Sequence, residues 1–215
     1  WAFAAGTVLL ALRRHNPALN ADIIVFCDAA LPANDARILQ EMGAQLVPFA
    51  PLGAELTEEA LSVFSPLSLA KFHCFDLLRH YESVVWLDSD ILIQDSVDDL
   101  FACGPLGLAL EDPQFSDPPG AKPAQINLHG AVQGFDGGAD NLNSGIIVFR
   151  NDLPQPDALR HMCTDFVCRH GVLLRYPDQA AFNALAQMLL RQQPQCVQLS
   201  AISSSFCIVF LERST

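Results

Sequence analysis

The sequence turns from apolar to acidic at Trp86-Leu87-Asp88-Ser89-Asp90, and apolar residues resume at Ile91-Leu92-Ile93. The apolar run over 83–87 is short enough to predict a buried strand. An ionised carboxylate is costly to bury unless a cation compensates it. Asp-x-Asp in an extended segment places both side chains on one face, and carboxylate oxygens suit Mg²⁺ or Mn²⁺. We therefore predict a metal site at Asp88 and Asp90; the alternative is a polar turn between strands, in which one Asp is a cap.

Size and charge narrow the class of protein. The chain has 215 residues, of which 51% are hydrophobic, so it can bury a sizeable core in one domain. Its formal net charge of −12 argues against nucleic acid or an anionic membrane as the main partner. A nucleotide ligand stays compatible with this charge, because a bound divalent cation can reverse the local field.

The cysteines and the first residues bear on compartment. The seven cysteines are scattered and form no CxxC pair, which predicts free core thiols in a reducing compartment rather than a zinc site. Residues 2–12 are apolar but too few to span a bilayer, so we predict a helix packed on the core. The expected location is cytoplasmic or peripheral to the cytoplasmic membrane, and a trimmed secretory-pathway anchor is the alternative.

Strand and helix patterns alternate along the first half of the chain. We predict helices at 2–14, 34–42, 67–80 and 96–101, and strands at 23–27, 45–49, 83–88 and 107–110. Asn34 is the expected N-cap of its helix and Gly43 the expected stop. Such alternation predicts an α/β fold with a parallel, doubly wound sheet. Ligands of these sheets bind at the carboxyl ends of strands, where Asp28 and Asp88 fall.

Prolines and glycines interrupt this alternation over 111–141. Because long irregular segments in compact domains are commonly functional, we interpret 111–141 as a separate irregular lobe. Regular structure is predicted to resume with a strand at 145–149 and helices at 156–170 and 178–191. The last twenty residues are ambiguous, and 206–211 is the candidate strand there.

Four motifs, in this order and at this spacing, resemble glycosyltransferase family 8. They are Leu69-Ala70-Lys71-Phe72-His73-Cys74, Trp86-Leu87-Asp88-Ser89-Asp90-Ile91-Leu92 with Val97-Asp98-Asp99-Leu100-Phe101 after it, Leu142-Asn143-Ser144-Gly145-Ile146-Ile147-Val148-Phe149 and Tyr176-Pro177-Asp178-Gln179. The resemblance implies a GT-A (Rossmann-like) fold over 1–215, with a mixed, mainly parallel sheet flanked by helices. It also implies retaining transfer of a hexose from a nucleotide sugar, with UDP-glucose or UDP-galactose as the expected donor and Mn²⁺ (or Mg²⁺) as cofactor.

The resemblance assigns one group of residues to the donor nucleotide and the metal. Asp88 and Asp90 would bind the metal, and Asp88 would also face the ribose, with Ser89 between them in the same site. Lys71 would reach the donor diphosphate or sugar; by itself, a lysine on an amphipathic helix is more often an exposed side chain. Asp28 would line the nucleotide pocket, or else cap the next turn.

A second group would act at the transferred sugar. Asp178 and Gln179 would lie near the reacting carbon, and Asn143 would bind sugar hydroxyls. Without the resemblance, Asp178 after Pro177 is a natural helix N-cap, and Asn143 is a turn residue before a strand.

Two other functions stay open at this stage. A metal-dependent nucleotidyltransferase also combines paired carboxylates with a Rossmann-like sheet. A truncated or degenerate, non-catalytic family member is the other alternative, because the family's first strand would precede Trp1 and its downstream metal-binding His has no counterpart after His170. We therefore expect a domain incomplete at both ends. The 111–141 lobe is expected to face the acceptor, whose class (glycan, lipid or protein) the sequence does not indicate, nor does it indicate the oligomeric state.

Overall fold

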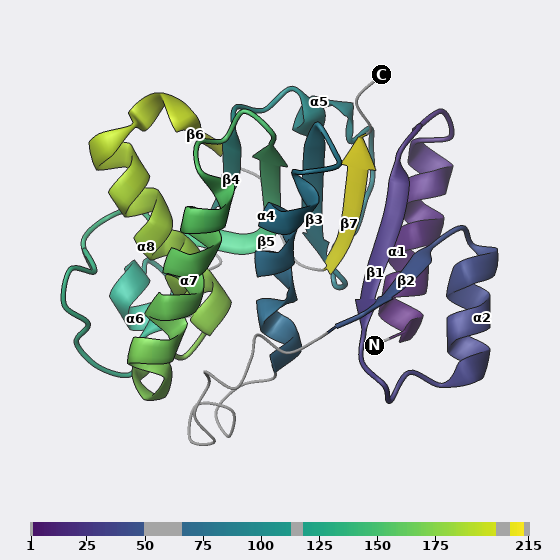
Figure 1. Cartoon of the computed structure of the whole chain (residues 1–215). Coiled ribbons are helices and arrows are strands. Elements are labelled where there is room, and N and C mark those ends of the chain that lie inside the picture. The colour runs from purple at the N-terminus through teal and green to yellow at the C-terminus, as the bar shows by residue number, and fades with distance from the viewer. Residues whose placement is uncertain (1, 50–65, 113–117, 201–206, 213–215) are drawn as a thin grey trace.

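A single seven-stranded sheet organises the protein (Figure 1). The computed structural model describes residues 2–49, 66–112, 118–200 and 207–212. The strands are β1 (Asp22–Cys27), β2 (Gln45–Pro48), β3 (Ser83–Asp88), β4 (Leu106–Leu110), β5 (Leu142–Arg150), β6 (Val197–Ser200) and β7 (Cys207–Glu212). Their order across the sheet is β2-β1-β7-β3-β5-β4-β6.

The helices flank this sheet. The α-helices are α1 (Ala2–His15), α2 (Ala33–Glu41), α4 (Cys74–Leu77), α5 (Asp98–Phe101), α6 (Pro123–Asn127), α7 (Pro156–His170) and α8 (Pro177–Gln192). The 3₁₀-helices are η1 (Pro66–His73), η2 (Gly171–Leu173) and η3 (Pro194–Cys196). Within the described ranges, no helix is long and apolar enough to cross a membrane.

The sheet is mixed. β1 pairs in parallel with β2, and β4 pairs in parallel with β6. β7 runs antiparallel to both β1 and β3, and β5 runs antiparallel to both β3 and β4. It follows that β1, β2, β3, β4 and β6 point one way and that β5 and β7 point the other. The predicted α/β class with a mixed, mainly parallel sheet is confirmed, whereas a purely parallel, doubly wound sheet is wrong, because both neighbours of β3 are antiparallel to it.

Alternating side chains of the central strands pack into two separate hydrophobic cores, one on each face of the sheet. On β3, Val84 and Trp86 pack toward α4, α7 and α8, which lie over the viewer's side of the sheet in Figure 1. Val85 and Leu87 belong to the opposite core, to which α1 contributes Val8, Leu9 and Leu12. This alternation is the two-residue period of a strand buried on both faces. Asp88 therefore shares the α8 side of the sheet with Trp86.

The predicted amphipathic helix over 67–80 is wrong. The segment is the 3₁₀-helix η1 followed by the single turn α4. Leu69, Ala70, Lys71 and Phe72 are all buried, which a single apolar stripe on an exposed α-helix cannot provide. Enclosure by the surrounding elements, rather than helix propensity, therefore sets the backbone here.

Smaller differences concern helix ends and the lobe. Pro32, not Asn34, is the N-cap of α2, and the Asn34 side chain instead accepts a hydrogen bond from Arg37 Nη2 at 3.1 Å. The stop at Gly43 is confirmed, and its φ of 84° is a conformation that favours glycine. The predicted helix at 96–101 is the shorter α5. The candidate strand at 206–211 corresponds to β7 except for Phe206, which lies outside the described residues, as do residues 113–117 of the lobe.

The aromatic core beneath α8 generates a stability prediction. Phe182 is buried against Phe72, Phe75 and Phe149, with ring centroids 5.5, 6.2 and 5.9 Å away. Phe182→Ala leaves a cavity and should lower the free energy of unfolding by about 3–5 kcal/mol. Phe3→Ala is the matched control, because Phe3 is 89% exposed, and it should change that free energy by less than about 0.5 kcal/mol. Urea denaturation measures both; equal midpoints would contradict the packing described.

Candidate active site

A cavity of about 740 Å³ opens beside the carboxyl ends of β1 and β3. Seven of the residues predicted from sequence to form a site line it, namely Asp28, Lys71, Asp88, Ser89, Asp90, Asp178 and Gln179. They come from segments that are up to about 150 positions apart along the chain, so only the fold brings them together. Asn143 is not among the lining residues.

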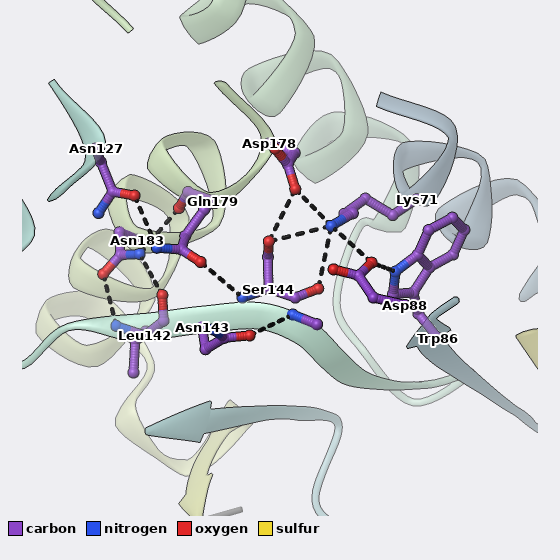
Figure 2. Close-up of polar contacts among 11 residues, drawn as sticks. Lys71, Trp86, Asp88, Asn127, Leu142, Asn143, Ser144, Asp178, Gln179 and Asn183 are labelled. Atoms are coloured by element: carbon purple, nitrogen blue, oxygen red, sulfur yellow. Dashed lines mark hydrogen bonds and ion pairs between the residues drawn. The ribbon is translucent and has the colours of Figure 1, made fainter. Parts of the chain in front are cut away.

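Lys71 is the centre of the polar contacts at this cavity. Figure 2 shows its Nζ between Asp178, Ser144 and Asp88. The distances are 2.5 Å to Asp178 Oδ2, 3.2 Å to Asp88 Oδ1 and 3.1 Å to both Ser144 Oγ and the Ser144 carbonyl oxygen. Lys71 is only 2% exposed, so the alternative of an exposed surface lysine is wrong. A buried ammonium is tolerated here because two carboxylates compensate its charge.

Trp86 fixes the position of Asp88. The indole Nε1 donates a hydrogen bond to Asp88 Oδ1 at 2.7 Å, and the Lys71 Nζ lies 5.5 Å from the Trp86 ring centroid. The second distance is within the range of a cation–π contact. One Asp88 oxygen therefore interacts with both Trp86 and Lys71, and these contacts hold the carboxylate at the end of β3.

Asp90 differs from Asp88 in conformation and in titration. β3 ends at Asp88, and Ile91 N donates to the Asp88 carbonyl oxygen at 3.4 Å, so Asp90 lies in a turn. The prediction of one extended segment carrying both carboxylates is therefore wrong; the strand gives way to a turn at the sheet edge. Partial burial, and then the nearby charge of Asp88, raise the pKa of the Asp90 carboxyl to about 6, although its residue is exposed overall.

Asp88 and Asp90 are the residues that would hold a divalent cation, and this metal site stays a prediction. In the part of the chain that the structure describes, no group of three or more His, Cys, Asp or Glu side chains could hold a metal. A cation at Asp88 and Asp90 would thus take its other ligands from water or substrate oxygens, as Mg²⁺ commonly does with phosphates. It would also favour the ionised form of Asp90, which partial burial and Asp88 disfavour.

Asp178 lies in the first turn of α8 but does not cap it. The N-cap is Tyr176, and no side chain makes a cap hydrogen bond there. Asp178 Oδ2 instead accepts hydrogen bonds from Lys71 Nζ and, at 2.8 Å, from Ser144 Oγ. The capping alternative is therefore wrong, and the carboxylate interacts with the same ammonium as Asp88.

Gln179 and Asn143 both lie on the side of this cluster that faces Asn127 and Asn183 in Figure 2. Gln179 Oε1 accepts a hydrogen bond from Ser144 N at 3.3 Å. Asn143 Oδ1 accepts one from Gly145 N at 2.7 Å, which is the local turn contact that sequence alone favours. A contact of Asn143 with a sugar stays a prediction.

Asp28 lies at the cavity and in the turn predicted for it, while its contact with a nucleotide stays a prediction. It lines the cavity, and its Oδ1 accepts a hydrogen bond from Ala30 N at 2.9 Å in the turn after β1. Sequence reasoning missed the parts played by Ser144 and Trp86, and by Asn127, whose Oδ1 accepts a hydrogen bond from Gln179 Nε2 at 2.9 Å. The position of Trp86 two residues before Asp88 on a strand could have placed both on one face, whereas nothing local marks Asn127.

Comparison with known proteins now places this site in a family. Residues 1–213 match the family described as glycosyl transferase family 8. The chain belongs to this family and is by class a glycosyltransferase. This assignment supports the predicted glycosyltransferase over the alternative of a nucleotidyltransferase. Comparison with curated protein sequences gives no match.

Solved structures agree on the fold. The galactosyltransferase LgtC in complex with donor and acceptor sugar analogs is similar with a TM-score of 0.60 and 16% identity, over 93% of this chain and 69% of LgtC. The apo form of the glycosyltransferase GlyE of Streptococcus pneumoniae TIGR4 is similar with a TM-score of 0.55 and 20% identity, over 92% of this chain and 41% of GlyE. These likenesses confirm the GT-A fold.

The buried Lys71 generates a prediction about stability. Lys71→Met removes the only described cation between two carboxylates and leaves both without their partner, so it should lower the free energy of unfolding by about 3–5 kcal/mol. Arg79→Met is the matched control, since Arg79 pairs with Asp157 at 2.7 Å on the surface, and it should cost less than about 1 kcal/mol. Denaturant titrations at pH 7 measure both; equal losses would contradict a compensated, buried ammonium.

Proposed function

We propose that this protein transfers a hexose from a UDP-linked sugar to an acceptor with retention of the anomeric configuration, and that a divalent cation, Mn²⁺ or Mg²⁺, assists. The observation that carries the proposal is the position of Lys71 Nζ, which joins Asp88 at the end of β3 to Asp178 at the start of α8. The Lys71 ammonium thus connects a carboxylate assigned to the metal with the carboxylate assigned to the sugar.

The diphosphate end of the cavity is suited to a leaving group that gains negative charge. A cation held by Asp88 and Asp90 would stabilise that charge as a Lewis acid. Lys71 adds a second positive group, fixed by Ser144 and buried, where its field is screened less than in water. The hydrogen bond from Trp86 gives Asp88 a second partner besides Lys71.

The contacts of Asp178 favour one route to retention. A double displacement needs a carboxylate that is free to attack the anomeric carbon. Asp178 Oδ2 already accepts hydrogen bonds from Lys71 and Ser144, which lowers its nucleophilicity. We therefore favour attack of the acceptor on the same face that the nucleotide leaves, with the departing phosphate taking the proton. Asp178 and Gln179 then position the sugar and stabilise its positive charge.

Metal-dependent donor binding is the first test. Asp88→Asn and Asp90→Asn each remove a charged ligand, so each should weaken UDP binding in Mn²⁺ by at least about tenfold, or 1.4 kcal/mol. Isothermal calorimetry of UDP with Mn²⁺ and with EDTA measures the effect. Asp98→Asn is the control, because Asp98 is an exposed acid on α5 and does not line the cavity. Equal affinity of the wild-type protein with and without Mn²⁺ would refute metal assistance.

Turnover tests the role of Asp178. Asp178→Asn removes a charge that matters most in the transition state, so kcat for hydrolysis of UDP-glucose or UDP-galactose should fall by about 100-fold while UDP affinity stays nearly unchanged. NMR of the first sugar released should show the anomer of the donor. A trapped glycosyl-Asp178 adduct would overturn the same-face route, and an inverted anomer would overturn retention. A wild-type protein that binds UDP with Mn²⁺ but turns over neither donor would point to the non-catalytic alternative.

A further inference from the structure

A line of side-chain hydrogen bonds runs from the cavity into the 111–141 lobe. It starts at Ser144 N, which donates to Gln179 Oε1 at 3.3 Å. Gln179 Nε2 donates to Asn127 Oδ1 at 2.9 Å, and Asn127 Nδ2 donates to Asn141 Oδ1 at 3.1 Å. Asn141 Nδ2 then donates to Glu111 Oε2. The three amides therefore link a strand of the active site to a carboxylate at the end of β4.

The two ends of this line fix the direction of every amide in it. A backbone N–H can only donate, and an ionised carboxylate can only accept. If any one of the three amides turned over, two acceptors or two donors would face each other. Such a mismatch in a buried place costs about as much as leaving a polar group unsatisfied. The orientation of the Gln179 amide is thus determined by the chain of partners as well as by Ser144.

Water cannot replace the partners of a reversed amide in this line, because the Asn127 and Asn141 side chains are buried. Asn127 is fully buried and Asn141 is 8% exposed. Backbone hydrogen bonds hold these residues as well, because Glu111 N donates to the Asn141 carbonyl oxygen at 3.0 Å and Arg175 N donates to the Asn127 carbonyl oxygen at 2.7 Å. Glu111 itself is half-buried, and this partial burial raises the pKa of its carboxyl.

We infer that Glu111, through Asn141 and Asn127, is a positioning residue that sets the polarity of the Gln179 amide at the cavity. The inference rests on the proposed function, since it assigns a task to Gln179 at the sugar. Figure 2 shows the Gln179 oxygen turned toward Ser144 and its nitrogen turned toward Asn127.

The consequence is electrostatic. Ser144 and Gln179 both line the cavity, and Ser144 also contacts the Lys71 and Asp178 pair. The carbonyl oxygen of Gln179 therefore lies on the side where the sugar would acquire positive charge, and its second lone pair can stabilise that charge. A reversed amide would put an NH₂ group there, whose positive end opposes the same charge. The lobe thus acts on the reaction through amide orientation, beyond any contact with an acceptor.

Two variants of Glu111 separate positioning from simple stability. Glu111→Leu removes the terminal acceptor, whereas the amide oxygen of Glu111→Gln can still accept from Asn141 Nδ2. Gln187→Leu is the matched control, because Gln187 is also a buried amide on α8 and also binds the lobe, through Asp136 N at 2.9 Å and Asp136 O at 3.0 Å. It does not line the cavity.

The direct measurement does not depend on turnover. In protein labelled with ¹⁵N-glutamine, the side-chain NH₂ signals of Gln179, assigned by their loss in Gln179→Glu, should be shifted and slow to exchange with solvent. Glu111→Leu should move them and speed their exchange at least about tenfold, as expected when a buried hydrogen bond is lost. Glu111→Gln and Gln187→Leu should leave them in place. Should Glu111→Leu fail to fold, Asn141→Ala interrupts the same line.

Activity provides the second readout. In Glu111→Leu, kcat for UDP-glucose hydrolysis should fall by about 10–100-fold, the usual effect of removing a residue that orients an active-site group, with UDP affinity unchanged. Glu111→Gln should retain most of the wild-type kcat. Gln179 signals that are unchanged in Glu111→Leu would overturn the inference, whether or not the protein turns over a donor. If the wild-type protein turns over no donor but Glu111→Leu still moves the Gln179 signals, the proposed function is refuted. The structural inference about Glu111 then stands.

Discussion

The buried ammonium of Lys71 is the interaction on which this site depends. A charged group that is 2% exposed must have compensating partners, and the fold supplies them from three elements: β3, β5 and α8. Breaking such a group of charges is costly, but replacing all of it with apolar side chains commonly is not. The buried charges therefore contribute little net stability compared with apolar side chains in the same place. The arrangement is better understood as a positive charge held ready at the edge of a cavity.

Ser144 connects the charged cluster around Lys71 with the line of amides that ends at Glu111. Its hydroxyl and carbonyl oxygen accept from Lys71, its hydroxyl donates to Asp178, and its backbone N–H donates to Gln179. Both networks thus depend on the start of β5. Asn183 anchors the same place, because it accepts from Leu142 N at 3.0 Å and donates to the Leu142 and Gln179 carbonyl oxygens at 2.8 and 2.9 Å. A displacement of α8 against β5 would disturb charge compensation and amide orientation together.

This dependence explains how an irregular lobe can matter to a site built on the sheet. Asn127 and Asn141 belong to the proline- and glycine-rich 111–141 stretch, yet both are buried in the line that ends at Gln179. Family membership defines the class of reaction, and the contacts of the lobe describe how this particular chain holds one of the family's motif residues. An irregular backbone is well suited to such a task, since it can place amides at spacings that a helix or strand does not allow.

Sequence alone determined the α/β class, most helices and strands, and the motifs that carry the active-site residues. Periodicity and composition are local properties, and the Asp88 and Asp178 motifs are readable wherever they fold. Sequence did not determine the 3₁₀ backbone around Lys71, the turn at Asp90, the antiparallel partners of β3 or the link from Glu111 to Gln179. Each of these depends on residues far apart in the chain: Lys71 is buried because β5 and α8 enclose it, and Asn127 meets Gln179 across 52 positions. Long-range contacts of this kind leave no periodic signal, because the free energy that selects them arises only when the sheet and its helices pack together.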